Sequence, residues 1–217
     1  MSEESSPHGD IIGSTYIDLG ADTREGYAIA ETSRRLARET IGDDTPEDRI
    51  RQRCSVAVGD FAMADLMRFV NDPVTAGVTL IRSGAPIYTD IRMVQVGILK
   101  KGHTCTVGCA LDYGADIAAK SGITRTSAGF IDLKEKIAGS IIVIGNAPSA
   151  LLSICNLIEE GIIPGLIIGT PVGFVNAAES KELLRTMPVP SVSNVGTRGG
   201  TPVAVASINE IITIALP

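Results

Sequence analysis

The sequence predicts one domain with a three-layer, doubly wound α/β fold. In the second half of the chain, apolar runs of strand length alternate with segments that show the 3.6-residue periodicity of helices. The strand segments are almost purely aliphatic, as expected for parallel strands that helices cover on both faces. A length of 217 residues with 44% hydrophobic residues suffices for one continuous core.

The first part of the chain begins with a polar segment. Residues 1–16 are rich in serine and glycine, which predicts a flexible N-terminal arm. From Thr23 onward, alanine and tyrosine alternate with arginine and glutamate at helical spacing, so we expect a surface helix. Asp72 followed by Pro73 predicts the N-cap and first residue of a helix that extends to Arg82.

A βαβ unit is predicted next. A short strand through Ile87 ends before Asp90, which is expected to cap a helix containing Met93. Residues 105–111 should then form a strand. Its two cysteines are four residues apart and would share one buried face, since strand side chains repeat every second residue.

The remaining elements follow a regular alternation. Asn176, at the start of one predicted helix, and Glu179 have the spacing of a capping box, which gives Glu179 a structural interpretation. Strands are expected over residues 140–144, 165–168 and 189–195. Helices are expected over residues 117–120, 127–137, 147–160 and 176–187. A last helix should begin at Thr201, because threonine precedes proline there.

Composition argues against several classes of function. The formal net charge is -6 without a run of basic residues, so neither nucleic acid nor an anionic membrane is an expected partner. The apolar runs are too short to span a bilayer and the N-terminus does not resemble a signal peptide, which predicts a soluble, cytoplasmic protein. The four cysteines form no C-x-x-C pair, so we expect buried thiols and no metal site.

Ligands of doubly wound folds bind beyond the carboxyl ends of the strands. The loops expected there contain Gly145-Asn146, Gly169-Thr170, and Gly199-Gly200. Glycines at such positions indicate either tight turns or the close approach of a ligand to backbone N–H groups. Neither G-x-G-x-x-G nor the P-loop motif occurs, so a mononucleotide or flavin site rests on the fold and the glycines alone.

Five segments at these loops resemble those of one enzyme family. In chain order they are RSGAPIYTDIRMV (residues 82–94), GITRTSA (122–128), IGNAPSALL (144–152), IIGTPVGFVNAAESKE (167–182) and RGGTPVAVA (198–206). Together they resemble the precorrin-8X or cobalt-precorrin-8 methylmutases of corrin biosynthesis. The likeness covers nearly the whole chain after the N-terminal arm.

The resemblance implies a flavodoxin-like homodimer, with residues 17–217 as the methylmutase-like domain. Such an enzyme moves a methyl group from C11 to C12 of a corrin-type tetrapyrrole, and it consumes no external cofactor. The substrate carries acetate and propionate arms, which suit N–H groups, hydroxyls and a few cations. The candidate substrate-binding residues are Arg53, Thr89, Asp90, Met93, Thr124, Arg125, Asn146, Ser180, Lys181, Arg198, Gly199 and Gly200.

One family position differs in a residue that matters for chemistry. The catalytic acid of the family is a histidine in a segment resembling R-x-x-H-A-T-G-D, and the matching stretch RCSVAVGD has Val56 there. Histidine suits proton transfer because its pKa lies near working pH, whereas valine carries no proton. The substitute acids to consider are Asp60, Tyr88, and a histidine from elsewhere in the chain, of which there are two, His8 and His103.

Three functions therefore remain open for a corrin site. In the first, the rearrangement still proceeds, because binding and bending of the ring contribute most of the rate enhancement and proton delivery contributes only about 10²–10⁴-fold. Alternatively, the chain has lost the chemistry and is a corrinoid carrier, or it acts on a different tetrapyrrole or step. A mononucleotide or flavin module is the alternative from another class, although the chain has no Trp and only 4% aromatic residues to stack on a flavin.

Overall fold

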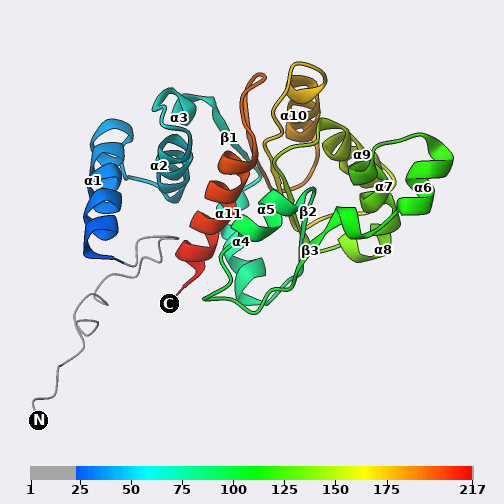
Figure 1. Cartoon of the computed structure of the whole chain (residues 1–217), viewed down its shortest axis with the longest axis horizontal. Coiled ribbons are helices and arrows are strands. Elements are labelled where there is room, and N and C mark those ends of the chain that lie inside the picture. The colour runs from blue at the N-terminus through cyan, green and yellow to red at the C-terminus, as the bar shows by residue number, and fades with distance from the viewer. Residues whose placement is uncertain (1–22, 217) are drawn as a thin grey trace, which may run out of the picture.

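A computed structural model describes residues 23–216 of the chain, in which a twisted six-stranded sheet lies between two layers of helices (Figure 1). The predicted arm at residues 1–16 lies outside the described residues. The strands, in sheet order, are β1 (Met67–Val70), β6 (Ser191–Asn194), β5 (Leu166–Gly169), β4 (Ile141–Ile144), β2 (Ile87–Thr89) and β3 (Val107–Cys109).

Five of the six strands are parallel. Strands β2 to β6 run in the order 3-2-4-5-6, which is the flavodoxin order 2-1-3-4-5 when β2 is counted as the first strand. Strand β1 pairs antiparallel with β6 at one edge, so the sheet is mixed. The doubly wound α/β fold is confirmed, whereas the antiparallel edge strand was not predicted.

Helices cover both faces of the sheet, and each face has its own apolar core. Alternate residues of β4 separate the two cores: Ile141 and Val143 face one, and Ile142 and Ile144 face the other. The first layer contains α2 (Pro46–Val58), α4 (Pro73–Arg82), α5 (Arg92–Gly97) and α11 (Thr201–Ala215), with α3 (Ala62–Leu66) at its edge. The second contains α7 (Arg125–Asp132), α8 (Lys134–Ile137), α9 (Pro148–Glu159) and α10 (Ala177–Thr186).

The two remaining helices lie at the ends of the molecule. Helix α1 (Arg24–Ile41) packs on the outer side of α2, as predicted for a surface helix, and α6 (Ala115–Ser121) projects beside α7 (Figure 1). No helix within residues 23–216 has the length and apolar character needed to cross a bilayer.

Some local predictions were wrong. Asp72 and Asn176 precede their helices as predicted, but both have positive φ and neither side chain makes a cap hydrogen bond, so the capping box with Glu179 is absent. The strand expected over residues 105–111 is only β3, because residues 110–112 tighten into a 3₁₀ turn. Its cysteines are nevertheless both buried, as expected.

Candidate functional site

The chain leaves the sheet in opposite directions from two neighbouring strands, β2 and β4. Strand β2 continues to β3 on one side, and β4 continues to β5 on the other. The loops after these strands therefore diverge at the carboxyl edge, which is where flavodoxin-like folds bind their ligands. The β5 and β6 loops extend this edge into what we call the rim, formed by residues 89–93, 110–112, 145–149, 170–176 and 195–200 together with the start of α7.

Asp90 connects the loop after β2 with the loop after β4, residues 145–149, which we call the β4 loop. Its side chain is fully buried, and it does not cap α5, whose N-cap is Ile91. The carboxylate instead accepts hydrogen bonds from the N–H groups of Ile91 (3.0 Å), Gly145 (3.2 Å), Asn146 (2.8 Å) and Ala147 (2.8 Å). Burial raises the pKa of Asp90, although the four N–H groups favour its charged form. Asp90 thus fixes the shape of the β4 loop.

The start of α7 is tied to the start of α9. Thr124 caps α7, and its hydroxyl lies 2.9 Å from that of Ser149 in the first turn of α9. The exposed Arg125 donates to the carbonyl of Leu111, 2.9 Å away, in the turn after β3. The structure therefore brings Thr124 and Arg125 to the same rim as Asn146 and Met93, whose side chains are exposed. Thr89 is buried and donates to backbone carbonyls of neighbouring segments.

A second group of predicted residues lies around the β6 loop. Ser180 and Lys181 are fully buried on α10, and the hydroxyl of Ser180 bonds within the helix. The Lys181 ammonium donates to the carbonyl of Arg198 at 2.6 Å and to Asn194 Oδ1 at 3.3 Å. The guanidinium of Arg198 is exposed and pairs with Asp60 at 2.7 Å.

The β4, β5 and β6 loops touch one another, so the two groups form one continuous surface. The backbone N–H of Thr170 donates to the Ile144 carbonyl (2.9 Å), and the Thr170 carbonyl accepts from the Gly200 N–H (2.7 Å). A Cβ on Gly145 would lie 2.9 Å from Thr201 Cα, and one on Gly199 would lie 2.3 Å from the Thr170 carbonyl oxygen. These glycines are therefore required for close packing of the loops, whichever ligand lies above them.

Exposed apolar residues of the β5 loop were missed by the sequence reasoning. Phe174 and Val175 are 95% and 75% exposed, and Val172 beside them is 45% exposed. Apolar side chains exposed together in this way mark a surface for a ligand or a partner. The available signal was the run PVGFV in a segment too short and too rich in Gly and Pro for a helix.

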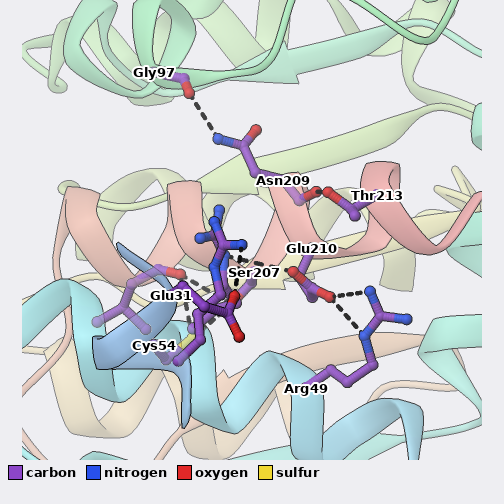
Figure 2. Close-up of polar contacts among 11 residues, drawn as sticks. Glu31, Arg49, Cys54, Gly97, Ser207, Asn209, Glu210 and Thr213 are labelled. Carbon is purple, nitrogen blue, oxygen red and sulfur yellow. Dashed lines mark hydrogen bonds and ion pairs between the residues drawn. The ribbon is translucent and has the colours of Figure 1, made fainter. Parts of the chain in front are cut away.

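Arg53 is not brought to the rim. It lies on α2 with its Nε 3.4 Å from Glu210 Oε2, on α11, while Arg49 reaches the other carboxylate oxygen at 2.7 Å (Figure 2). Burial raises the pKa of Glu210, although the two arginines oppose the shift. A cavity of about 550 Å³ between α1, α2 and α11 is lined by these residues and by Val56, which is 39% exposed.

The proposed substitute acids have separate placements. Asp60 is engaged by Arg198, and Tyr88 is half-buried on β2, where burial raises its pKa. His103 precedes β3 and therefore lies at the amino edge of the sheet, where its ring bonds to Leu99 and Cys105. His8 lies outside the described residues. Tyr88 and Asp60 thus remain the candidates nearest the rim.

Other reactive groups within residues 23–216 offer no further chemistry. All four cysteines are free and buried, and burial raises the pKa of Cys54 and Cys155 to about 12, which makes their thiolates scarce at neutral pH. No group of three or more His, Cys, Asp or Glu side chains in this part of the chain is placed to hold a metal ion.

Comparison with known proteins gives a consistent result. The family described as "Precorrin-8X methylmutase" matches residues 28–214. The cobalt-precorrin-8 methylmutase of Methanocaldococcus jannaschii is 42% identical over 207 residues, covering 91% of this chain and 98% of that protein. The precorrin-8X methylmutase of Pseudomonas aeruginosa is 35% identical, covering 88% and 93%. A crystal structure of the Thermus thermophilus precorrin-8X methylmutase superposes with a TM-score of 0.80 at 32% identity, covering 87% and 96%.

Proposed function

We propose, because the chain belongs to the precorrin-8X methylmutase family, that it moves the methyl group of precorrin-8 or cobalt-precorrin-8 from C11 to C12 at the rim described above. The protein is an isomerase of cobalamin biosynthesis. One carbon–carbon bond breaks at C11 and one forms at C12 in the same molecule, so the step needs no oxidant, reductant or external methyl donor.

The observation that supports this site best is the continuity of the rim within the family match. Every loop that contributes to it lies within residues 28–214, and the loops contact one another directly. A flat macrocycle with several carboxylate arms needs a broad surface with separated donors. Arg125 and Arg198 provide exposed guanidinium groups on different loops of such a surface.

Polar and apolar parts of the rim would bind different parts of the ring. The guanidinium groups and the Asn146 amide suit the carboxylate arms, while Met93, Phe174 and Val175 present apolar surface to the ring. Asp90 and Lys181 are fully buried and act from beneath, holding the loops rather than contacting the ligand. Arg53 pairs with Glu210 and lines the same cavity as Val56, away from the rim loops, where its ion pair helps to place α2 against α11.

We propose that Val56 takes the position of the family acid, because RCSVAVGD resembles R-x-x-H-A-T-G-D. A valine there supplies no proton, so we propose that binding and bending of the macrocycle provide most of the rate enhancement in this protein. Because product and substrate are isomers, any proton added during the step is returned. Tyr88 and Asp60 are the side chains that could exchange one.

Conversion of precorrin-8 and cobalt-precorrin-8 by the purified protein tests the proposal. Both substrates are incubated under anaerobic conditions with catalytic amounts of protein, and the product is identified by its absorption spectrum and chromatography. The proposal predicts many turnovers per protein with at least one substrate. A spectral change of only one ring per protein chain, with no isomerised product, would contradict the proposal.

A carrier is the second candidate, favoured by the aliphatic residue at Val56 and by the engagement of Asp60 with Arg198. The two functions give different results in the same assay, because a carrier binds the ring stoichiometrically without isomerising it. Val56→His should raise turnover in an active but proton-limited enzyme and create it in a carrier that has lost only the acid. The wild-type conversion therefore decides between the two functions.

We also propose that the protein is a cytoplasmic homodimer. The support is the family resemblance, which implies a homodimer. Light scattering coupled to size exclusion should give twice the 22.7 kDa chain mass. A monomer at assay concentrations would contradict the dimer without affecting the proposed reaction.

A further inference from the structure

Lys181 is a buried cation without a carboxylate partner among the residues that the structure describes. Its side chain is fully buried on α10, and its ammonium contacts only neutral oxygens, the Arg198 carbonyl at 2.6 Å and Asn194 Oδ1 at 3.3 Å. Removing an ammonium group from water is costly unless strong hydrogen bonds offset the loss. A leucine or methionine would fill this position at lower cost, so the cation has a role beyond packing.

The atom that Lys181 holds is the carbonyl oxygen of Arg198. The same oxygen accepts a second hydrogen bond from Asn194 Nδ2 at 2.6 Å. The next two residues, Gly199 and Gly200, have φ values of +142° and +107°, and the Gly200 N–H bonds to Thr170. Two donors at the oxygen thus fix the direction of the Arg198–Gly199 peptide next to two consecutive glycines with positive φ.

The fixed peptide connects three parts of the rim. The Arg198 side chain reaches Asp60 at the end of α2, and Asp60 Oδ1 in turn accepts from the N–H of Ala62 at 2.9 Å. Thr197 accepts from the N–H of Gly173 in the β5 loop at 3.1 Å. A displaced Arg198–Gly199 peptide would therefore disturb the β5 loop, the β6 loop and the end of α2 together.

We infer that Lys181 is a positioning residue for corrin binding: its buried ammonium holds the Arg198 carbonyl, and thereby sets the relative positions of the β5 loop, the β6 loop and the carboxyl end of α2. The inference rests on the proposed function for its ligand. It assigns no contact between Lys181 and the ring.

Lys181→Met tests the inference, with Arg185→Met as the matched control. Methionine keeps an unbranched side chain that fits the buried path but donates no hydrogen bond. Arg185 lies one turn further along α10 and donates to Ser193 and Asn194 on β6, not to the Arg198 loop. Both variants remove one cation from the same helix, so a difference between their binding constants reports on the hydrogen bond to the Arg198 carbonyl in the β6 loop.

The kinetic readout is the division of the effect between KM and kcat. Misplaced donors weaken the hold on the carboxylate arms in substrate and transition state alike, so Lys181→Met should raise KM and the Kd for hydrogenobyrinic acid by about tenfold or more. The kcat should stay within about threefold of wild type. Arg185→Met should change both constants less than about twofold. Wild-type KM and Kd in a folded Lys181→Met protein would overturn the inference.

Amide hydrogen exchange gives a readout that needs no ligand. The Gly200 amide should exchange at least tenfold faster in Lys181→Met than in wild type, with the Gly145 amide on the other side of the rim unchanged as an internal reference. Faster exchange with no corrin binding in wild type would retain the positioning role and reject the proposed function. Unchanged exchange would reject the positioning role. Where Lys181→Met does not fold, Lys181→Gln, whose head is too short to reach the carbonyl, replaces it in both measurements.

Discussion

Replacing Asp90 by asparagine should destabilise the protein, because it removes acceptors that hold the β4 loop. The carboxylate accepts four N–H groups, and one of its oxygens, Oδ2, receives those of Asn146 and Ala147 at 2.8 Å each. Asparagine keeps one oxygen and presents an NH₂ group in place of the other. Two partly buried N–H donors then face a donor and lose their acceptor.

The structure sets the size of the effect. An unsatisfied buried N–H group costs about 1–3 kcal/mol, so two would cost about 2–6 kcal/mol. Asparagine also removes a buried charge, and the raised pKa of Asp90 shows that its burial is unfavourable to the charged form. Allowing for this relief, we expect the free energy of unfolding of Asp90→Asn to fall by about 3 kcal/mol.

Urea denaturation with linear extrapolation measures this difference. Asp112→Asn is the control, because Asp112 is an exposed carboxylate at the same rim that pairs with Arg92, and such pairs contribute less than about 1 kcal/mol. A loss below about 1 kcal/mol in Asp90→Asn would refute the view that its carboxylate holds the β4 loop. The same variant should bind hydrogenobyrinic acid more weakly, since the Asn146 loop would no longer be fixed.

Three other changes have defined outcomes. Gly199→Ala should lose about 3 kcal/mol of stability in urea denaturation, because it adds a Cβ at φ +142° and 2.3 Å from the Thr170 carbonyl oxygen. The control Gly122→Ala, at φ +66° with open space around it, should lose only about 1 kcal/mol. Burial, with a smaller effect of Arg185, lowers the pKa of Lys181 from its ordinary 10.5 to about 8. Between pH 8 and 10.5, therefore, the unfolded state binds more protons than the folded state. Wild type should therefore gain up to about 1.4 kcal/mol per pH unit relative to Lys181→Met from pH 8 to 9, and parallel pH profiles would contradict the shift. If the ring extends from the rim to the cavity that Val56 lines, Val56→His should raise turnover by about tenfold or more in an active enzyme, and unchanged kcat with normal binding would show that this position does not limit proton delivery.

Much of the fold was predictable because aliphatic runs and helical periodicity are local signals. The buried segments IIVI and LIIG became β4 and β5, and the loops after them lie at one edge as the doubly wound fold requires. Helix α2 was missed, although Thr45, Pro46 and Asp48 form a proline-containing capping box at its start. Its buried polar residues and low amphipathicity reflect contacts with α1 and α11 that no local pattern reveals.

Most candidate site residues lie near the predicted strand-end loops, although Arg53 does not, and the contacts of several were not predictable. Asp90 follows a strand and precedes a helix, which locally favours a cap, yet its carboxylate faces the β4 loop from across the sheet. Lys181 in the fifth position of an amphipathic helix gives no sign that it is buried. Both roles depend on partners supplied by segments distant in sequence, Gly145 to Ala147 for one and Arg198 for the other. Sequence spacing therefore indicated the rim, and tertiary contacts decided which of its residues are buried beneath it and which are exposed on it.

The central claim is that the rim is a corrin site, and a spectral titration of the wild-type protein with hydrogenobyrinic acid tests it most directly. The account predicts a saturable change in the absorption of the ring, with one ring bound per chain, and a weaker isotherm for Arg198→Ala. An unaltered ring spectrum at a large excess of protein would contradict the account.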